Sequence, residues 1–266
     1  MSTSVHTTAI VDSKAELGSG VIIGPYCLVG PDVVIGEDTE LLSHTTVTGR
    51  TTMGAGNRVF PFSSIGQEPQ DLKYHGEDSE VIIGDNNTFR ENVTVNSGTE
   101  GGGMVTRMGS NNMLMAYTHV AHDCILGNGI VLANCSTLAG HVEVADGAII
   151  GGLSAIQQFV RIGQFAMIGG MSGVTKDVPP FCLVAGGYRA GLSGLNVIGL
   201  KRRGYKLEQI RRLKEVYRVL LQESGKKDER LAAARALAGE DESALSLIEF
   251  ISSAKRGLTM HGRDSE

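Results

Sequence analysis

The stretch that decides the fold spans residues 120–150 and reads VAHDCILGNGIVLANCSTLAGHVEVADGAII. Every sixth residue in it is large and apolar: Val120, Leu126, Leu132, Leu138, Val144 and Ile150. A helix repeats about every 3.6 residues and a strand every two, so a strict period of six fits a short strand and a tight turn that recur together. The stretch therefore predicts a regular coil of short strands.

The same period runs along most of the N-terminal two thirds of the chain. It covers residues 17–65, returns over 83–95, and continues through 108–174. Glycine often follows the large residue, and the residue two places before it is usually small or β-branched. Residues two apart in a strand share a side, so both positions are expected to point inward, with the glycines at corners. This is the hexapeptide signature of a parallel β-helix, and it makes Cys27 and Cys124 inward packing residues.

Two segments break the period and are expected to loop out of the coil. They are residues 67–80 (QEPQDLKYHGEDSE) and 96–107 (NSGTEGGGMVTR). Loops that project from a rigid scaffold often carry function, and Asp71 and Lys73 are the obvious polar candidates in the first of them.

The hexads stop after Pro179 and Pro180, and the pattern becomes helical from about Gly194. Apolar stripes predict one helix around residues 207–221, a second in 229–238, and a third in 242–256 that Gly257 closes. We therefore predict a mainly β protein: a β-helix over residues 1–190 and a small α-helical domain over residues 191–266.

Composition limits the class of protein. The chain has 266 residues, 41% of them apolar, with 36 glycines and no tryptophan. Its start has no signal-peptide pattern and no apolar run is long enough to cross a bilayer, so a cytoplasmic protein is expected. The four cysteines have neither C-x-x-C spacing nor the density of a disulfide scaffold, which favours reduced thiols.

Charge is uneven along the chain. Residues 1–194 carry 9 basic and 18 acidic side chains, whereas residues 195–266 carry 15 basic and 11 acidic ones. The C-terminal segment is therefore expected to attract an acidic partner. We expect no nucleic-acid partner.

The segment YTHVAHDC, residues 117–124, sets two histidines beside an aspartate. His119 and His122 flank the inward Val120, so both are expected to face outward or to lie at a corner. If one coil takes three hexads, residues eighteen apart stack on each other. Two adjacent columns would then form on one edge: His122, Gly140 and Gln158, and beside them Asp123, His141 and Phe159. A base, a bare backbone N–H and an amide would converge there.

Two further interpretations of these residues stay open. His119, His122 and His141 together offer three nitrogens, which is a zinc-ligand set, although the carboxylate next to His122 suits a base and its orienting acid. Farther along, the basic run 201–203 (KRR) fits either a solvated helix start or a group that holds a diphosphate.

Six motifs together closely resemble one family, over nearly the whole chain. They are QDLKY (70–74), AHDC (121–124), TLAGHVEV (137–144), QQFVRIG (157–163), SGVTKDVPPF (172–181) and GLKRRG (199–204). The family is the UDP-N-acetylglucosamine acyltransferases that start lipid A synthesis. The resemblance implies a left-handed, three-faced β-helix, a homotrimer with active sites between subunits, and transfer of an (R)-3-hydroxyacyl group from acyl carrier protein to the 3-hydroxyl of UDP-N-acetylglucosamine.

The resemblance also implies roles for particular residues. His122 matches the general base, Asp123 its orienting acid, and Gly140 the residue whose N–H stabilises the oxyanion. Residues that match the sugar and acyl sites are Asp71, Lys73, His119, His141 and Gln158. Residues that match the nucleotide site are Asn196, Arg202 and Arg203. Gly170 matches the ruler for acyl length, where glycine implies a chain of the myristoyl class. No metal and no cofactor is implied, since the donor is carried on the phosphopantetheine of acyl carrier protein, which is strongly acidic.

Three departures from the family pattern leave the acceptor atom open. Gln157 stands where many members have histidine, Ile198 where glutamate is common, and segment 187–194 is one residue longer than in the enteric enzymes. Some relatives acylate a 3-amino sugar nucleotide instead. Three different classes of protein also stay open: a γ-type, zinc-dependent carbonic anhydrase, a non-catalytic β-helix scaffold, and the sister N-acyltransferase, which carries an extra domain before its repeats.

Overall fold

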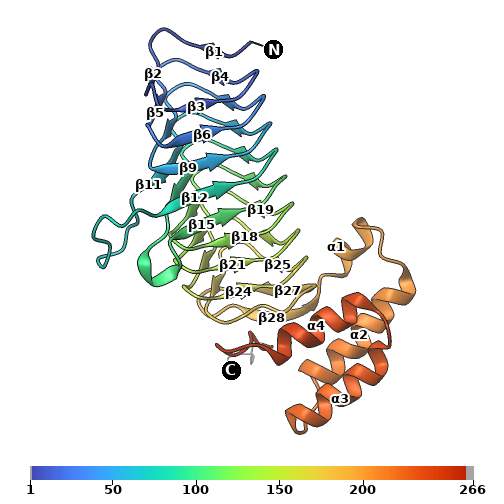
Figure 1. Cartoon of the computed structure of the whole chain (residues 1–266). Coiled ribbons are helices and arrows are strands. Elements are labelled where there is room, and N and C mark those ends of the chain that lie inside the picture. The colour runs from blue at the N-terminus through green and yellow to red at the C-terminus, as the bar shows by residue number, and fades with distance from the viewer. Residues whose placement is uncertain (1, 262–266) are drawn as a thin grey trace.

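The computed structural model describes residues 2–261. Short strands wind into stacked coils, and a small group of helices follows at the C-terminal end of the stack (Figure 1). Each turn of the coil adds one strand to each of three sheets. Neighbouring strands are parallel, and the register pairs residues eighteen apart, as in Val120 opposite Leu138. The stacking that the period predicts is therefore present.

The three sheets are called A, B and C in the order in which the chain visits them. Sheet A contains β1 (Ser4–Val5), β4 (Ile22–Ile23), β7 (Glu40–Leu41), β10 (Arg58–Val59), β13 (Thr88–Phe89), β16 (Met113–Leu114), β19 (Val131–Leu132), β22 (Ile149–Ile150), β25 (Met167–Ile168), β27 (Cys182–Ala185) and β28 (Gly191–Leu195). Sheet B contains β2 (Ile10–Val11), β5 (Leu28–Val29), β8 (Thr46–Val47), β11 (Ser64–Gln67), β14 (Thr94–Asn96), β17 (His119–Val120), β20 (Thr137–Leu138), β23 (Ala155–Ile156) and β26 (Gly173–Val174). Sheet C contains β3 (Glu16–Leu17), β6 (Val33–Ile35), β9 (Arg50–Met53), β12 (Glu80–Ile83), β15 (Val105–Met108), β18 (Ile125–Leu126), β21 (Glu143–Val144) and β24 (Arg161–Ile162).

The large residues of the hexads fill the inside of the coil. Leu114, Val120, Leu132 and Leu138, for example, have no exposed surface. The coil begins earlier than the clearest part of the pattern, because β1 and β2 precede Leu17 and already pair with the next turn. The exposed first turn needs fewer apolar residues, so its signal in the sequence is weaker.

Three edges join the sheets and are named here for the sheets that they connect: A–B, B–C and C–A. Non-glycine residues with positive φ recur at these corners, among them Tyr117 (62°) on the A–B edge and Asp123 (59°) and His141 (61°) on the B–C edge. The left-handed backbone conformation makes the tight turn and points the side chain away from the coil. Side chains at successive corners therefore line up along each edge.

Both segments that interrupt the hexads leave the coil. The first lies between β11 and β12, and the second, between β14 and β15, contains a short 3₁₀ helix, η1 (Glu100–Gly102). Figure 1 shows both loops on the same side of the stack.

Four helices follow the coil: α1 (Val197–Arg202), α2 (Leu207–Leu221), α3 (Lys227–Ala238) and α4 (Glu242–Ser252). The strand β28 lies beyond the expected domain boundary at residue 190, because it pairs antiparallel with β27. The basic run 201–203 ends helix α1 and does not start a helix, since Asn196 caps α1 upstream. Helix α4 ends at Ser252, earlier than the stripe suggests, and the following segment runs beside the coil. Within residues 2–261, no helix is long and apolar enough to cross a membrane.

Candidate active site

The candidate site lies on the B–C edge, where the two expected columns form. The N–H of His141 donates to the carbonyl of His122 (3.0 Å), and the N–H of Phe159 donates to that of Gly140 (3.1 Å). The rings of His141 and Phe159 stack with centroids 4.2 Å apart, and the ring of His122 meets that of His141 edge-on at 5.1 Å.

His122 and Asp123 form the centre of the site. Nδ1 of His122 lies 2.7 Å from Oδ2 of Asp123, and the aspartate side chain has no exposed surface. Two further hydrogen bonds reach that carboxylate from Thr99: its backbone N–H donates to Oδ1 (2.8 Å) and its hydroxyl to Oδ2 (2.6 Å). A buried charge needs such partners, and here they fix the carboxylate so that it orients the imidazole.

The loop of residues 96–107 covers this carboxylate. A Cβ on Gly102 would overlap the Asp123 carboxyl group, so only glycine allows the loop to lie this close. From the other side, the backbone N–H of Asp123 donates to the hydroxyl of Thr106 (2.8 Å). The loop therefore removes water from Asp123 and leaves the ring of His122 partly accessible.

Gly140 lies directly against the ring of His122. A Cβ at this position would overlap the imidazole, and the N–H of Gly140 donates to no acceptor within residues 2–261. Since Nδ1–H of His122 is directed to Asp123, the lone pair lies on Nε2. A basic nitrogen and a bare N–H donor are thus next to each other.

The pKa values of two neighbouring histidines are lowered. Burial lowers the pKa of His119, whose Nδ1 lies 2.7 Å from the hydroxyl of Thr94. Burial also lowers the pKa of His141, and the carboxylate of Asp123 partly offsets that effect. Asp71 raises and Lys73 lowers the same pKa, so the first loop brings both charges within electrostatic range of His141.

The zinc interpretation fits these residues poorly. Within residues 2–261, the one trio of potential ligands on a common centre is His122, Asp123 and His141, and it excludes His119. Both oxygens of Asp123 already accept hydrogen bonds from Thr99, and Oδ2 also lies within hydrogen-bond distance of Nδ1 of His122. The donor set is that of a base and its orienting acid.

The residues expected at the nucleotide lie on a different edge. The side chain of Asn196 caps α1 by accepting from the N–H of Gly199 (3.0 Å). Arg203 donates to the carbonyl of Gly147 (2.6 Å) and covers the ring of Phe165, which places it on the C–A edge. Arg202 is exposed nearby. Within one chain, Asn196 and Arg203 therefore lie on a different edge from His122.

Gly170, the expected acyl ruler, lies on the third edge, A–B. It stacks on Gly152, and a Cβ on Gly170 would come within 3.2 Å of the Gly152 carbonyl oxygen. The outward positions of sheet B between this edge and His122 are small: Thr137, Ala155 and Gly173. Gln158 is exposed on the B–C edge, next in the column after Gly140.

Two of the three departures from the family pattern meet at one cavity. Gln157 and part of segment 187–194 line the same space of about 530 Å³ beside the B–C edge. Ile198 is exposed on α1, away from that cavity.

The sequence did not predict the contacts of Thr99 and Thr106 with Asp123, because no period relates a loop residue to a corner of the coil. The signal in the sequence that could have indicated these contacts is the glycine-rich composition of residues 96–107, which lets the loop lie close to the coil.

Known proteins are similar to this chain in sequence and in fold. The family described as "Udp N-acetylglucosamine O-acyltransferase; Domain 2" matches residues 177–259, and "Bacterial transferase hexapeptide (six repeats)" matches residues 14–49 and 106–140. The chain is 48% identical over 254 residues to the acyl-(acyl-carrier-protein)–UDP-N-acetylglucosamine O-acyltransferase of Thermodesulfovibrio yellowstonii, which covers 96% of this chain and 98% of that protein. It is 45% identical over 256 residues to the protein of the same name from Anaeromyxobacter sp., with 96% and 99% covered. The solved UDP-N-acetylglucosamine acyltransferase of Francisella novicida superposes with a TM-score of 0.94 at 39% identity, covering 97% of this chain and 95% of that one.

The fold and the site define a hexapeptide-repeat transferase with a helical C-terminal segment. Within that class, the chain belongs to the acyl-(acyl-carrier-protein)–UDP-N-acetylglucosamine O-acyltransferase family. The predicted fold, a left-handed parallel β-helix followed by helices, is confirmed by the solved relatives. The prediction of an O-acyltransferase enzyme is confirmed as well.

Proposed function

We propose that this protein transfers an (R)-3-hydroxyacyl group from acyl carrier protein to the 3-hydroxyl of UDP-N-acetylglucosamine, the first step of lipid A synthesis. The observation that carries the proposal is the meeting of His122, Asp123 and the N–H of Gly140 on one edge of the coil. Relatives at 45% and 48% identity are named for this donor and this acceptor.

The geometry of these three groups supports a general-base mechanism. Nε2 of His122 takes the proton of the sugar hydroxyl while the hydroxyl oxygen attacks the thioester carbon. The N–H of Gly140 donates to the oxyanion that forms. When the C–S bond breaks, the imidazolium returns the proton to the leaving thiolate, so His122 ends the cycle neutral. The mechanism uses no cofactor other than the phosphopantetheine that carries the donor.

We assign the substrate contacts by their distance from this centre. The stacked rings of His141 and Phe159 continue along the edge from His122, and Asp71 and Lys73 lie within electrostatic range of His141. These groups, with Gln158 and His119, are suited to hold the sugar. The acyl chain would cross the small outward residues of sheet B toward Gly170, which leaves room for a chain of the myristoyl class.

We propose that the enzyme is a homotrimer with its site between subunits. In one chain the base lies on the B–C edge, whereas Asn196 and Arg203 lie on the C–A edge, so the site is incomplete without a second chain. The A–B edge also carries a column of exposed apolar residues: Tyr26, Phe62, Tyr117, Leu153 and Met171. Apolar columns of this kind mark contacts between proteins.

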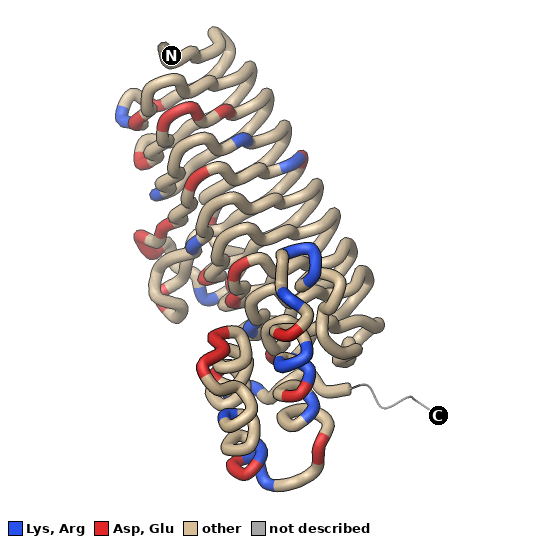
Figure 2. Tube along the Cα trace, turned by 90° about the vertical axis from the view of Figure 1, so that its right-hand side faces the viewer, with Lys and Arg blue, Asp and Glu red and all other residues tan. Residues whose placement is uncertain are grey.

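The basic C-terminal segment is suited to dock the acidic acyl carrier protein. Figure 2 shows few Lys and Arg along the coils and more of them on the helical segment. Charge complementarity of this kind speeds association and sets orientation. We also propose a cytoplasmic location, where both substrates would be present, and cell fractionation tests it.

The first experiment measures acyl transfer from a panel of 3-hydroxyacyl carrier proteins to UDP-N-acetylglucosamine. We expect transfer by the native chain, with a preference for the longer donors, and a loss of roughly 10²–10⁴-fold in His122→Ala, which is the usual contribution of a general base. Transfer to the 3-amino analogue alone would reassign the acceptor, and residual activity near native in His122→Ala would reject the mechanism.

A second experiment tests the shared site by mixing two inactive variants. His122→Ala and Arg203→Ala are unfolded, mixed in equal amounts and refolded together. If each site takes His122 from one subunit and Arg203 from its neighbour in a ring of three, about one quarter of the sites contain both native residues. Recovery of about a quarter of native activity supports the arrangement, and no recovery with trimers formed contradicts it.

A further inference from the structure

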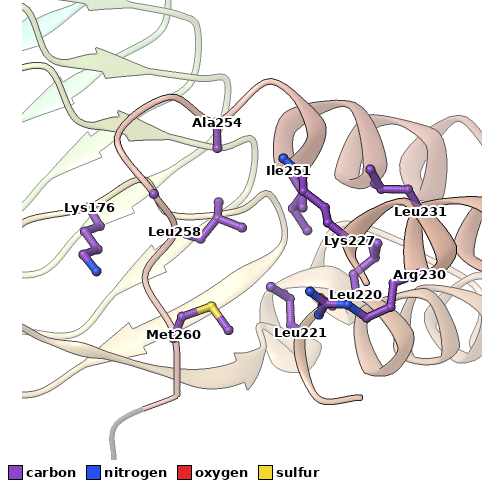
Figure 3. A pocket seen from close by; sticks show the side chains of 11 residues that line it. Lys176, Leu220, Leu221, Lys227, Arg230, Leu231, Ile251, Ala254, Leu258 and Met260 are labelled. Carbon is purple, nitrogen blue, oxygen red and sulfur yellow. The ribbon is translucent and has the colours of Figure 1, made fainter. Parts of the chain in front are cut away.

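A second cavity, of about 310 Å³, lies between the helices and the segment that follows α4 (Figure 3). Its walls are mainly apolar and include Leu220, Leu221, Leu231, Leu258 and Met260. It is separate from the candidate active site, because none of the residues assigned to catalysis or to the sugar lines it.

The cavity persists because hydrogen bonds to the coil hold its outer wall in place. The N–H of Asp177 donates to the carbonyl of Gly257 (3.1 Å), and the N–H of Thr259 donates back to that of Asp177 (2.8 Å). The N–H of Leu192 reaches the carbonyl of Met260 (2.9 Å). Protein interiors rarely leave gaps larger than a water molecule between apolar walls. A gap whose wall cannot move inward is suited to a ligand.

The polar groups at the cavity are cationic. Lys227 and Arg230 extend from α3, Lys227 toward the end of α4 and Arg230 toward Leu220, and Lys176 lies on the coil side of the outer wall (Figure 3). No acidic side chain lines the space, and none of the three cations forms an ion pair within residues 2–261. Charge of one sign beside apolar walls favours an anion that is attached to an apolar group.

The existing partners of these cations leave their charge uncompensated. Nη1 of Arg230 donates to the carbonyl of Leu220 (2.7 Å), while Nε is buried and has no hydrogen-bond partner among residues 2–261. In the described part of the chain, the ammonium of Lys227 donates only to the carbonyl of Ser252, at 3.3 Å. The nearby Glu223 is paired with Arg218. An anionic head group would supply the missing counter-charge.

We propose that this cavity binds a single-chain anionic amphiphile of the fatty-acid class. Its carboxylate would lie between Lys227 and Arg230, and its chain would lie along Leu221, Leu258 and Met260. Ligand cavities usually measure about 300–1,000 Å³, so this one is at the lower limit and suits one narrow chain, not a bulky ligand. The proposal is independent of the transfer reaction.

The site lies at the far end of the catalytic edge. Register places Lys176 eighteen residues after Gln158, so it continues the column of His122, Gly140 and Gln158. Three coil steps of about 4.8 Å each separate His122 from Lys176, which is about 14 Å. A ligand held by α3 and the outer wall therefore leaves the reacting groups free.

The test is a titration of the full chain with myristate labelled with ¹³C at the carboxyl carbon, below its micellar concentration, followed by NMR. We expect one saturable site per chain. Lys227→Met and Arg230→Met should each weaken binding about tenfold, the size of one lost charge contact. Ala254→Phe, which fills the cavity, should abolish binding. The matched control is Lys226→Met, an exposed neighbour that does not line the cavity and should change affinity less than twofold.

Three other ligands and one variant of the acyl path separate binding in this cavity from other kinds of binding. Tetradecanol, which has no charge, should bind at least tenfold more weakly than myristate, and acetate should not bind. Gly170→Met should leave myristate binding unchanged. If Gly170→Met loses myristate binding and Ala254→Phe keeps it, myristate binds along the acyl path on sheet B and not in this cavity. Equal effects of Lys226→Met and Lys227→Met, or a preference of more than tenfold for tetradecyl phosphate, would overturn the proposal. Since Arg230 also holds the end of α2, thermal unfolding of each variant confirms that it is folded.

Discussion

Thr99 provides the most informative test of how the site is built. Its side chain donates to Oδ2 of Asp123 at 2.6 Å, and that oxygen also faces Nδ1 of His122. Thr99→Val keeps the shape and the backbone N–H bond to Oδ1, and removes only the hydroxyl. A hydrogen bond to a buried charge is worth roughly 1.5–3 kcal/mol. If the carboxylate needs this bond to orient the imidazole, kcat should fall roughly 10- to 150-fold.

The assay separates orientation from binding and from folding. We expect KM for UDP-N-acetylglucosamine to stay within about twofold, because Thr99 acts on the base through Asp123 and is a positioning residue. Thr99→Ser should restore most of kcat, since it returns the hydroxyl. Thr52→Val, on an exposed strand position of sheet C, is the matched control and should behave as native. A folded Thr99→Val enzyme with native kcat would refute the reasoning, as would an equal loss in Thr99→Ser.

Four further outcomes follow from the structure. Gly140→Ala places a Cβ against the ring of His122, so kcat should fall at least tenfold with little change in thermal unfolding; a native rate would mean that the ring is not confined. Gly170→Met should shift donor preference toward shorter acyl chains in competition assays, and an unchanged preference would remove Gly170 as the ruler. Burial lowers the pKa of His119, so between that pKa and the ordinary value the unfolded chain binds more protons than the folded one, and the free energy of unfolding should fall as the pH drops through this window. Urea titrations at pH 7 and pH 5 should show a smaller fall of that free energy in His119→Gln than in the native chain. An identical fall would contradict the lowered pKa. Iodoacetamide at pH 8 should label Cys135 slowly in the native trimer and quickly in the unfolded chain, because Cys135 lies in the column of the A–B edge that we propose as a subunit contact, while the other three cysteines are buried; fast labelling of Cys135 in the trimer would contradict that contact.

The coil and its columns could be predicted from the sequence because the hexad is a local rule. Each large residue such as Leu138 is buried for the same reason as Val120, and parallel pairing then fixes that residues eighteen apart stack. The columns of His122 and Asp123 followed from this spacing alone. The end of α4 and the strand β28 did not, because they depend on pairing with distant parts of the coil that leave no period in the sequence.

The part of the site that the sequence could not supply is the surroundings of Asp123. The period places this residue at a corner, where side chains normally point into solvent, and a solvated aspartate would orient a histidine only loosely. The loop of residues 96–107 changes that environment by burying the carboxylate and supplying two donors from Thr99.

The repeat and the interruption therefore have different roles. The repeat can only set identical corners along an edge, so it cannot by itself distinguish the corner at Asp123 from the corners at His141 and Phe159. The insertion between β14 and β15 breaks this equivalence at one turn of the coil, because it needs extra residues that the hexad does not provide. A coil of strict hexads would present His122 with an exposed, mobile acid. The interruption of the pattern is thus what turns a surface histidine into an oriented base.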